Sequence, residues 1–128
     1  MKLVHPLKQV LGSGSAKSGT GHWVWQRITA IALVPLTLWV IWAIVGLRGA
    51  SYAEVMQCLA NPLVATLLIS WVIAMLYHAQ LGLQVVYEDY IHIHWLEITL
   101  QLVTKFAAFA GIVIAVLSMA KVVVGGAG

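Results

Sequence analysis

His78 is the side chain whose position in this sequence most favours chemistry. It lies a few residues past the centre of the second of three long apolar runs, where an ionisable group is costly and usually faces the interior of a helix bundle. A neutral imidazole nitrogen there can be an axial ligand of haem iron. Gly82, one helical turn further on, would leave space beside the ring for a flat macrocycle. A hydrogen-bonding strut between two helices is equally compatible with a single histidine.

Two further polar residues lie at the end of the same run. Asp89 follows His78 by eleven residues, close to three helical turns, so a continuous helix places both on one face about 16 Å apart along its axis. Tyr90 can donate a hydrogen bond from its hydroxyl to a ligand carbonyl while its ring stays at headgroup depth. The other interpretation of Tyr90 is an anchor at the membrane interface.

Arg27 opens the first apolar run, at the same expected depth as Asp89 and Tyr90. Its permanently charged, forked guanidinium could hold a carboxylate or a haem propionate. Two simpler interpretations remain open. Arg27 could be a charge that sets the membrane topology, or it could form an ion pair with Asp89.

Other kinds of chemistry find little support in the sequence. His92 and His94 alternate in a short loop, but two histidines without a third ligand at a fixed spacing favour a solvated or partner-facing role over a metal site. The single cysteine, Cys58, cannot form a disulfide framework. No nucleophile with its base, phosphate-binding glycine loop or paired-carboxylate site is recognisable. We therefore expect the chain alone not to be a complete enzyme, but a part of an electron-transfer complex.

The elements that must position these residues are membrane helices. Of the 128 residues, 62% are hydrophobic and 9% are charged, whereas a soluble domain has roughly 25% charged residues. The apolar runs 28–47, 63–87 and 98–124 each reach the roughly 20 residues that cross a ~30 Å hydrocarbon core as a helix. Pro35 predicts a kink in the first helix, and Pro62 predicts the start of the second. The sequence predicts an all-α integral membrane protein, a single domain of three transmembrane helices.

Charged residues predict the orientation of the chain. Three lysines and Arg27 lie in the predicted cytoplasmic N-terminal segment, 1–27, whereas the first loop has only Arg48 opposite Glu54. This asymmetry predicts a cytoplasmic N-terminus and a periplasmic C-terminus. It also accounts for the net charge of +3, so no nucleic-acid partner is expected. The second loop is acidic and lacks lysine and arginine, which favours a surface that meets another protein; its acids are Glu88, Asp89 and Glu97.

The segment from His78 to Tyr90, H-A-Q-L-G-L-Q-V-V-Y-E-D-Y, resembles the signature of the hydrophobic membrane anchor subunit of succinate dehydrogenase, the smaller of the two anchors of complex II. It has a histidine, a glycine four residues on, and an Asp-Tyr pair eleven and twelve residues on. The first helix adds W-x-x-x-R-x-T-A from Trp23 to Ala30, which is similar to the arginine and small-residue pair of that family. The length of the chain, its three predicted helices and their predicted orientation are also similar to those of the family, so the resemblance extends over nearly the whole chain.

The resemblance implies a role for each candidate residue. His78 would be one axial ligand of haem b, with the other histidine supplied by a companion anchor of the cytochrome b556 type. Tyr90 would donate a hydrogen bond to a ubiquinone carbonyl, and Asp89 would orient polar groups or water beside it. Arg27 would lie near the haem propionates and the quinone pocket. The acidic loop would dock the iron–sulfur subunit, which receives electrons from the succinate-oxidising flavoprotein subunit.

Two other functions remain open from the sequence. The anchor of a quinol:fumarate reductase would take part in the same chemistry in reverse. A structural or transport subunit without a cofactor would use His78 only in packing, although a transporter more commonly has broken helices or paired inward charges. The N-terminal segment is not arginine-rich in the manner of an organelle transit peptide, which favours a bacterial inner membrane.

Overall fold

The fold is a row of three long helices with a short fourth helix at one end. A computed structural model describes residues 16–125 of the chain. Its helices, in chain order, are α2 (Ala16–Gly46), α3 (Tyr52–Ala60), α4 (Pro62–Tyr90) and α5 (His94–Gly125). Part of the predicted cytoplasmic segment, 1–15, lies outside the described residues, and its remainder, 16–27, forms the first turns of α2.

Three helices are long and apolar enough to cross a membrane, which confirms the prediction of an all-α protein with three transmembrane helices. The candidate spans have 28 residues (Gly19–Gly46), 29 residues (Pro62–Tyr90) and 32 residues (His94–Gly125). At 1.5 Å per residue each is longer than the ~30 Å hydrocarbon core requires. The helices therefore extend beyond the apolar runs, because the polar residues that flank each run continue the same backbone hydrogen bonding.

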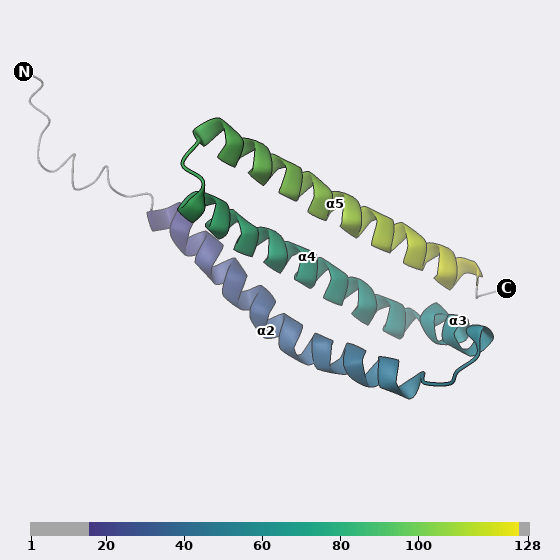
Figure 1. The fold of residues 1–128 in the computed structure, drawn as a ribbon. Coiled ribbons are helices and arrows are strands. Elements are labelled where there is room, and N and C mark those ends of the chain that lie inside the picture. The colour runs from purple at the N-terminus through teal and green to yellow at the C-terminus, as the bar shows by residue number, and fades with distance from the viewer. Residues whose placement is uncertain (1–15, 126–128) are drawn as a thin grey trace, which may run out of the picture.

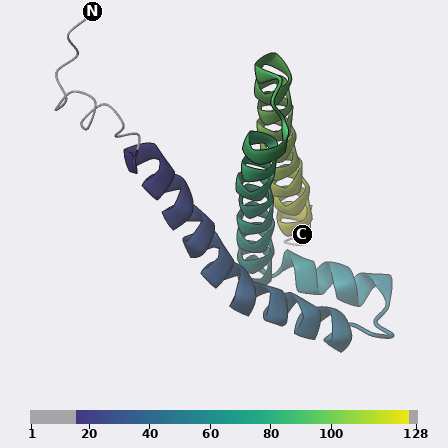
Figure 2. The same ribbon diagram turned by 60° about the vertical axis from the view of Figure 1, so that its left-hand side comes forward.

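The two prolines act as their positions predict. Pro35 lies inside α2, which continues through it, and Figure 2 shows that α2 is bent rather than broken. A proline inside a helix removes one backbone hydrogen bond and displaces the preceding turn, which is a sufficient cause of such a bend. Pro62 is the first residue of α4, and the side chain of Asn61 caps this helix by accepting a hydrogen bond from the Leu63 N–H at 2.9 Å.

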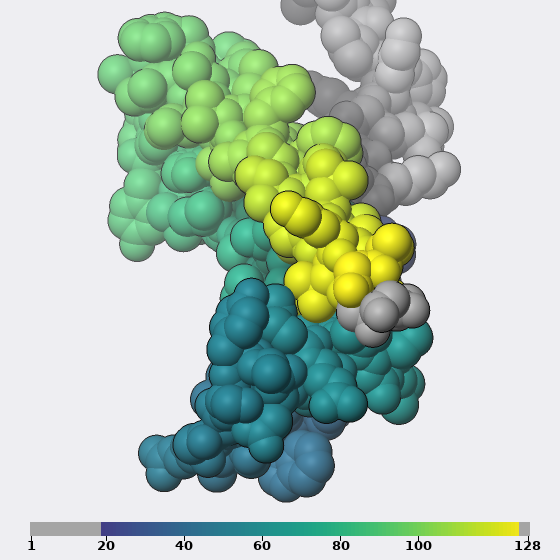
Figure 3. Space-filling model, turned by 90° about the vertical axis from the view of Figure 1, so that its right-hand side faces the viewer, coloured from purple at the N-terminus to yellow at the C-terminus, as the bar shows by residue number. Residues whose placement is uncertain are grey.

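Helix α3 was not predicted from hydropathy, because its nine residues are too few and too mixed to form an apolar run. Its start is nevertheless encoded by a capping box. The hydroxyl of Ser51 accepts a hydrogen bond from the Glu54 N–H at 3.4 Å, and the Glu54 carboxylate accepts one from the Ser51 N–H at 2.7 Å. The helix packs against α4 and α5, and Figure 3 shows it at the surface beside the C-terminal end of α5.

The carboxyl group of Glu54 provides a pH-dependent test of this capping box. The backbone N–H of Ser51, and then its hydroxyl, hold the pKa of Glu54 below its ordinary value. A lowered folded-state pKa means that the stabilisation is complete above the pKa of the unfolded chain and is lost as the pH falls through the folded value. We expect the first turn of α3 to fray in acid, as followed by NMR of the Glu54 carboxyl and the Val55 amide. The Ser51→Ala variant loses the hydroxyl but keeps the backbone N–H, so the pKa of Glu54 should move only part of the way back towards its ordinary value. An unchanged titration in that variant would show that the hydroxyl does not contribute.

Helix α4 is the centre of the row. It packs against α2 on one side and α5 on the other, and within residues 16–125 the helices α2 and α5 do not contact each other (Figure 1). Each neighbour runs antiparallel to α4. Two side-chain hydrogen bonds join α2 to α4, one from Trp71 Nε1 to Thr37 Oγ1 at 3.0 Å and one between Thr29 Oγ1 and His78 Nδ1 at 2.9 Å. The Tyr87 and Thr104 hydroxyls, 3.0 Å apart, join α4 to α5. The layer is therefore open on both faces, so lipid or a partner protein must cover most of each helix.

Burial in the described residues agrees with this open arrangement. Only five of them are buried, and most large apolar side chains are exposed; the five are Thr29, Val40, Ala65, Gln80 and Leu81. A soluble protein of this size would have a continuous apolar core, because water penalises exposed apolar area. In a bilayer the lipid tails are as apolar as the side chains, so the exposed surface carries no such penalty.

Loss of the bond between Trp71 and Thr37 should weaken the packing of α2 on α4 by a modest amount. In Thr37→Val the shape is kept but the acceptor is removed, and interhelical hydrogen bonds in membranes contribute about 0.6 kcal/mol on average and up to about 1.7 kcal/mol. A double-mutant cycle with Trp71→Phe, measured by reversible unfolding in detergent, should return a coupling energy in this range. A coupling energy of zero would show that the contact does not stabilise the fold.

Candidate functional site

His78 lies at the contact between α4 and α2, about two turns from the polar pair Trp71–Thr37 along α4. Its Nδ1 is 2.9 Å from the hydroxyl of Thr29, a buried residue of α2. The ring is half-buried, and its second nitrogen, Nε2, makes no hydrogen bond with any described residue. The imidazole therefore does bridge two helices, as the strut interpretation requires. It also keeps one nitrogen available, as a metal ligand requires.

Gly82 lies at the contact between α4 and α2, next to a polar side chain. Gly82, which was expected to leave room for a flat macrocycle, faces the side chain of Gln26 on α2: a Cβ atom added at Gly82 would lie 3.7 Å from Gln26 Nε2. This is an ordinary van der Waals distance. Gly82 therefore borders a polar seam between α2 and α4, which we define by His22, Gln26 and Thr29 of α2 and His78 and Gly82 of α4.

This polar seam has two unsatisfied atoms. His22 Nε2 and Gln26 Oε1 are buried and have no hydrogen-bond partner among the described residues. A buried polar atom without a partner costs about 1–3 kcal/mol, so most buried polar atoms are paired with protein or with ordered water. Sequence reasoning did not select either residue for a site. His22, Gln26 and Thr29 are spaced at i, i+4 and i+7, which places them on one face of α2. This spacing is the sequence pattern from which a polar face of the first helix could have been predicted.

Asp89 and Tyr90 occupy the last turn of α4, which confirms that the helix continues from His78 to both residues. Both side chains are exposed, with Tyr90 retaining 77% of its accessible surface. A phenol and a carboxylate at the end of a membrane helix can donate to and orient a carbonyl-bearing ligand that approaches along the bilayer boundary. Within residues 16–125 neither side chain forms an ion pair, so both are free for a ligand or a partner.

Arg27 is exposed on α2, and its guanidinium lies 5.0 Å from the ring centroid of Trp23, one turn earlier. This is a cation–π contact. The ion pair with Asp89 that the sequence left open is not formed in the part of the chain that the structure describes. The contact of His94 Nδ1 with the Glu97 carboxylate, at 3.9 Å, is an ion pair only when the imidazole is protonated. Figure 1 shows the start of α2 and the end of α4 at the same end of the molecule. Arg27 lies further along α2, however, because its neighbours Gln26 and Thr29 are opposite Gly82 and His78, so it is not level with Asp89 and Tyr90 as the sequence predicted.

The two histidines of the second loop do not belong to a metal-binding group among the described residues. His92 and His94 are exposed, and His94 Nδ1 is close to the Glu97 carboxylate. Residues 16–125 contain no group of three or more His, Cys, Asp or Glu side chains that could hold a metal ion. An axial haem ligand needs only one histidine from each of two chains, so this finding leaves the role of His78 open.

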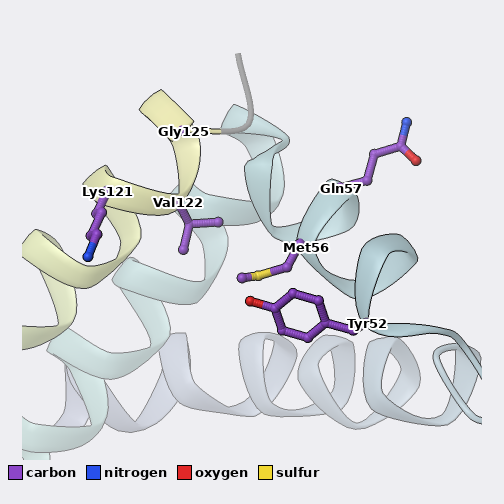
Figure 4. Close-up of a pocket in the computed structure, with 6 residues that line it drawn as sticks. All are labelled: Tyr52, Met56, Gln57, Lys121, Val122 and Gly125. Carbon is purple, nitrogen blue, oxygen red and sulfur yellow. The ribbon is translucent and has the colours of Figure 1, made fainter. Parts of the chain in front are cut away.

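A cavity lies at the opposite end of the molecule from Asp89 and Tyr90. It has a volume of about 610 Å³, is formed between α3 and the end of α5, and is lined by Tyr52, Met56, Gln57, Lys121, Val122 and Gly125. Figure 4 shows the Tyr52 ring and Met56 facing Val122 across it, while Gln57 points away. None of the candidate residues lines this cavity, so it is not part of the candidate site.

Comparison with known proteins agrees with this geometry. The family model described as "Succinate dehydrogenase/Fumarate reductase transmembrane subunit" matches residues 1–119. A relative from Rickettsia bellii named succinate dehydrogenase hydrophobic membrane anchor subunit is 42% identical over 101 residues, which cover 79% of this chain and 81% of the relative. The protein of the same name from Rickettsia conorii is 37% identical over 108 residues, or 84% of this chain and 86% of the relative.

No solved structure matches the chain significantly. The relatives are bacterial proteins, and three apolar helices are found in the structure. Both observations agree with a multi-pass protein of a bacterial inner membrane. The match over residues 1–119, together with relatives above 30% identity over most of both chains, is decisive. The chain belongs to the succinate dehydrogenase/fumarate reductase transmembrane subunit family.

Proposed function

We propose that this chain is the hydrophobic membrane anchor of a succinate:ubiquinone oxidoreductase and contributes to the binding of haem b and ubiquinone. One observation carries the proposal: α4 holds His78 between helices with Nε2 free, and the same helix ends in the exposed pair Asp89–Tyr90. A half-buried candidate ligand and an exposed hydrogen-bond donor are thus joined by one helix. The names of the relatives favour succinate dehydrogenase within a family that also includes fumarate reductase.

The residues of the polar seam fit a haem. His78 Nε2 would bind the iron on one side, and a histidine of a companion cytochrome b556-type anchor would bind it on the other. The unsatisfied His22 Nε2 and Gln26 Oε1 support the proposal, because a polar group or water that enters with the haem would give them partners. Arg27 would pair with a haem propionate or line the quinone pocket, since its guanidinium is exposed and forms no ion pair with a carboxylate of residues 16–125. When bound, the haem would supply a one-electron carrier beside the quinone site.

Ubiquinone would bind at the end of the molecule that holds Tyr90. The Tyr90 hydroxyl would donate a hydrogen bond to one quinone carbonyl, and Asp89 would orient that hydroxyl or a water beside it. Reduction of a quinone to a quinol takes up two protons. A phenol and a carboxylate at the boundary can pass protons from water to the quinone oxygens, while the apolar helices exclude water from deeper in the layer.

The open layer implies partner proteins. The companion anchor would cover part of the exposed apolar surface of the row, and the iron–sulfur subunit would dock on the acidic loop formed by Glu88, Asp89 and Glu97. The flavoprotein subunit, which oxidises succinate, would sit beyond the iron–sulfur subunit. This arrangement requires the N-terminus and the second loop on the cytoplasmic side and the C-terminus in the periplasm, as the distribution of basic residues predicts.

The proposal is tested by purifying the complex from membranes through an affinity tag on this chain. The purified complex should contain flavoprotein, iron–sulfur and second anchor subunits, reduce ubiquinone with succinate, and show a b-type haem in a reduced-minus-oxidised absorbance spectrum. Cells without the chain should retain succinate oxidation with a water-soluble dye but lose its coupling to membrane quinone. A chain that purifies alone, or a complex that transports a solute without redox activity, would refute the proposal.

A further inference from the structure

The hydroxyl of Thr29 lies among three polar atoms of the seam. It is 2.8 Å from the carbonyl oxygen of Trp25, 3.1 Å from that of Gln26, and 2.9 Å from Nδ1 of His78. A threonine hydroxyl has a single hydrogen to donate and two lone pairs with which to accept, whereas a carbonyl oxygen can only accept. The position of this one hydrogen therefore decides which nitrogen of His78 carries a proton.

The helix favours donation to the carbonyl. Thr29 is buried, with 7% of its surface exposed, and a threonine inside a helix ordinarily donates to the carbonyl four residues earlier, here that of Trp25. With its hydrogen used in this way, Oγ1 offers His78 only a lone pair, so Nδ1 must donate. The resulting chain, Nδ1–H to Oγ1–H to the Trp25 carbonyl, aligns its dipoles, and each bond strengthens the next.

We propose that Thr29 is a positioning residue that holds His78 in the tautomer with hydrogen on Nδ1, so that the lone pair on Nε2 is directed to the haem iron. The inference rests on the proposed function, since it assumes that His78 binds haem. The opposite tautomer would place a hydrogen on Nε2 and block ligation. The Thr29 acceptor also raises the basicity of the bound imidazole, which favours the oxidised iron and lowers the haem reduction potential.

Thr29→Val and Thr29→Ser in the assembled complex separate this role from packing. Valine keeps the shape of threonine without the hydroxyl, whereas serine keeps the hydroxyl. Thr37→Val is the matched control, because it removes the other hydrogen bond between α2 and α4, from Trp71 Nε1 at 3.0 Å, without touching His78. The readouts are the haem midpoint potential and the haem affinity, measured by transfer of haem to apomyoglobin.

In Thr29→Val we expect a higher midpoint potential and haem affinity weakened by about 10- to 100-fold, as for other groups that orient a metal-binding histidine. Thr29→Ser and Thr37→Val should both retain the native potential. If the Thr29→Val complex contains haem with the native midpoint potential and affinity, the inference about Thr29 is wrong, but the proposed function stands. Equal shifts of the midpoint potential in the valine and serine variants would also overturn the inference, because they would assign the effect to side-chain shape. A native complex without haem would overturn both the haem site and the inference that rests on it.

Discussion

The complex that carries His78→Ala is expected to lose its b-type haem absorption. Alanine removes Nε2, the nitrogen that makes no hydrogen bond within the described residues, and leaves the iron with the ligand of the companion anchor only. Removing a group that merely supports a metal ligand lowers affinity roughly 10–100-fold, so loss of the ligand itself should exceed that range. The measurement is a reduced-minus-oxidised absorbance spectrum, normalised to the flavin content of the purified complex.

A control is needed because His78→Ala also removes the hydrogen bond to Thr29 and with it a contact between α2 and α4. Thr37→Val removes a comparable contact between the same helices and should keep its haem signal. His94→Ala tests the specificity for histidine, since His94 is exposed in the second loop. If His78→Ala assembles with the native haem spectrum and midpoint potential, the ligand assignment is wrong and His78 is only a strut between helices.

Much of this fold could be predicted because the bilayer constrains it strongly. A backbone that crosses hydrocarbon must satisfy its own hydrogen bonds, so long apolar runs become helices whatever their detailed packing. The prolines were equally predictable from local chemistry. Pro62 follows the capping residue Asn61 at the start of α4, and Pro35 bends α2 without ending it. In both cases the decisive interactions are local in the sequence.

The features that could not be predicted depend on weaker or longer-range contacts. Hydropathy overlooked α3, although Ser51 and Glu54 together encode its capping box. The sequence also left open whether the three helices close into a bundle. Lipid and side chains are equally apolar, so hydrophobicity does not decide between a bundle and the open row that is observed. Polar contacts and the covering partner decide it instead.

The candidate site shows the same division. The positions of His78, Asp89 and Tyr90 on one helix follow from spacing, and α4 does extend over all three. The pairing of His78 with Thr29 does not follow, because it depends on the register of α2 against α4, which many apolar side chains set together. Arg27 illustrates the limit most clearly: its charge was visible in the sequence, but its contact with Trp23 in place of Asp89 required the structure.

Replacement of Tyr90 by phenylalanine should leave assembly intact and sharply reduce quinone reduction. The ring is 77% exposed at the end of α4, so loss of the hydroxyl leaves no buried polar atom unsatisfied. If Tyr90 passes a proton to the quinone, kcat should fall by about 10²-fold, the lower end of the range for a positioned acid. If it only holds the carbonyl, loss of one hydrogen bond of about 1 kcal/mol should raise KM roughly fivefold and spare kcat.

Steady-state rates with succinate and a short-chain ubiquinone distinguish these outcomes, while succinate oxidation by a water-soluble dye, which bypasses the anchor, should stay constant. Tyr52→Phe is the matched control, because Tyr52 is also highly exposed, at 80%, but begins α3 at the opposite end of the row. It should leave both kcat and KM unchanged. Unchanged kinetics in Tyr90→Phe would make Tyr90 an interfacial anchor and move the search for the quinone donor to the companion subunit. A loss shared equally with Tyr52→Phe would instead indicate a general disturbance of the layer.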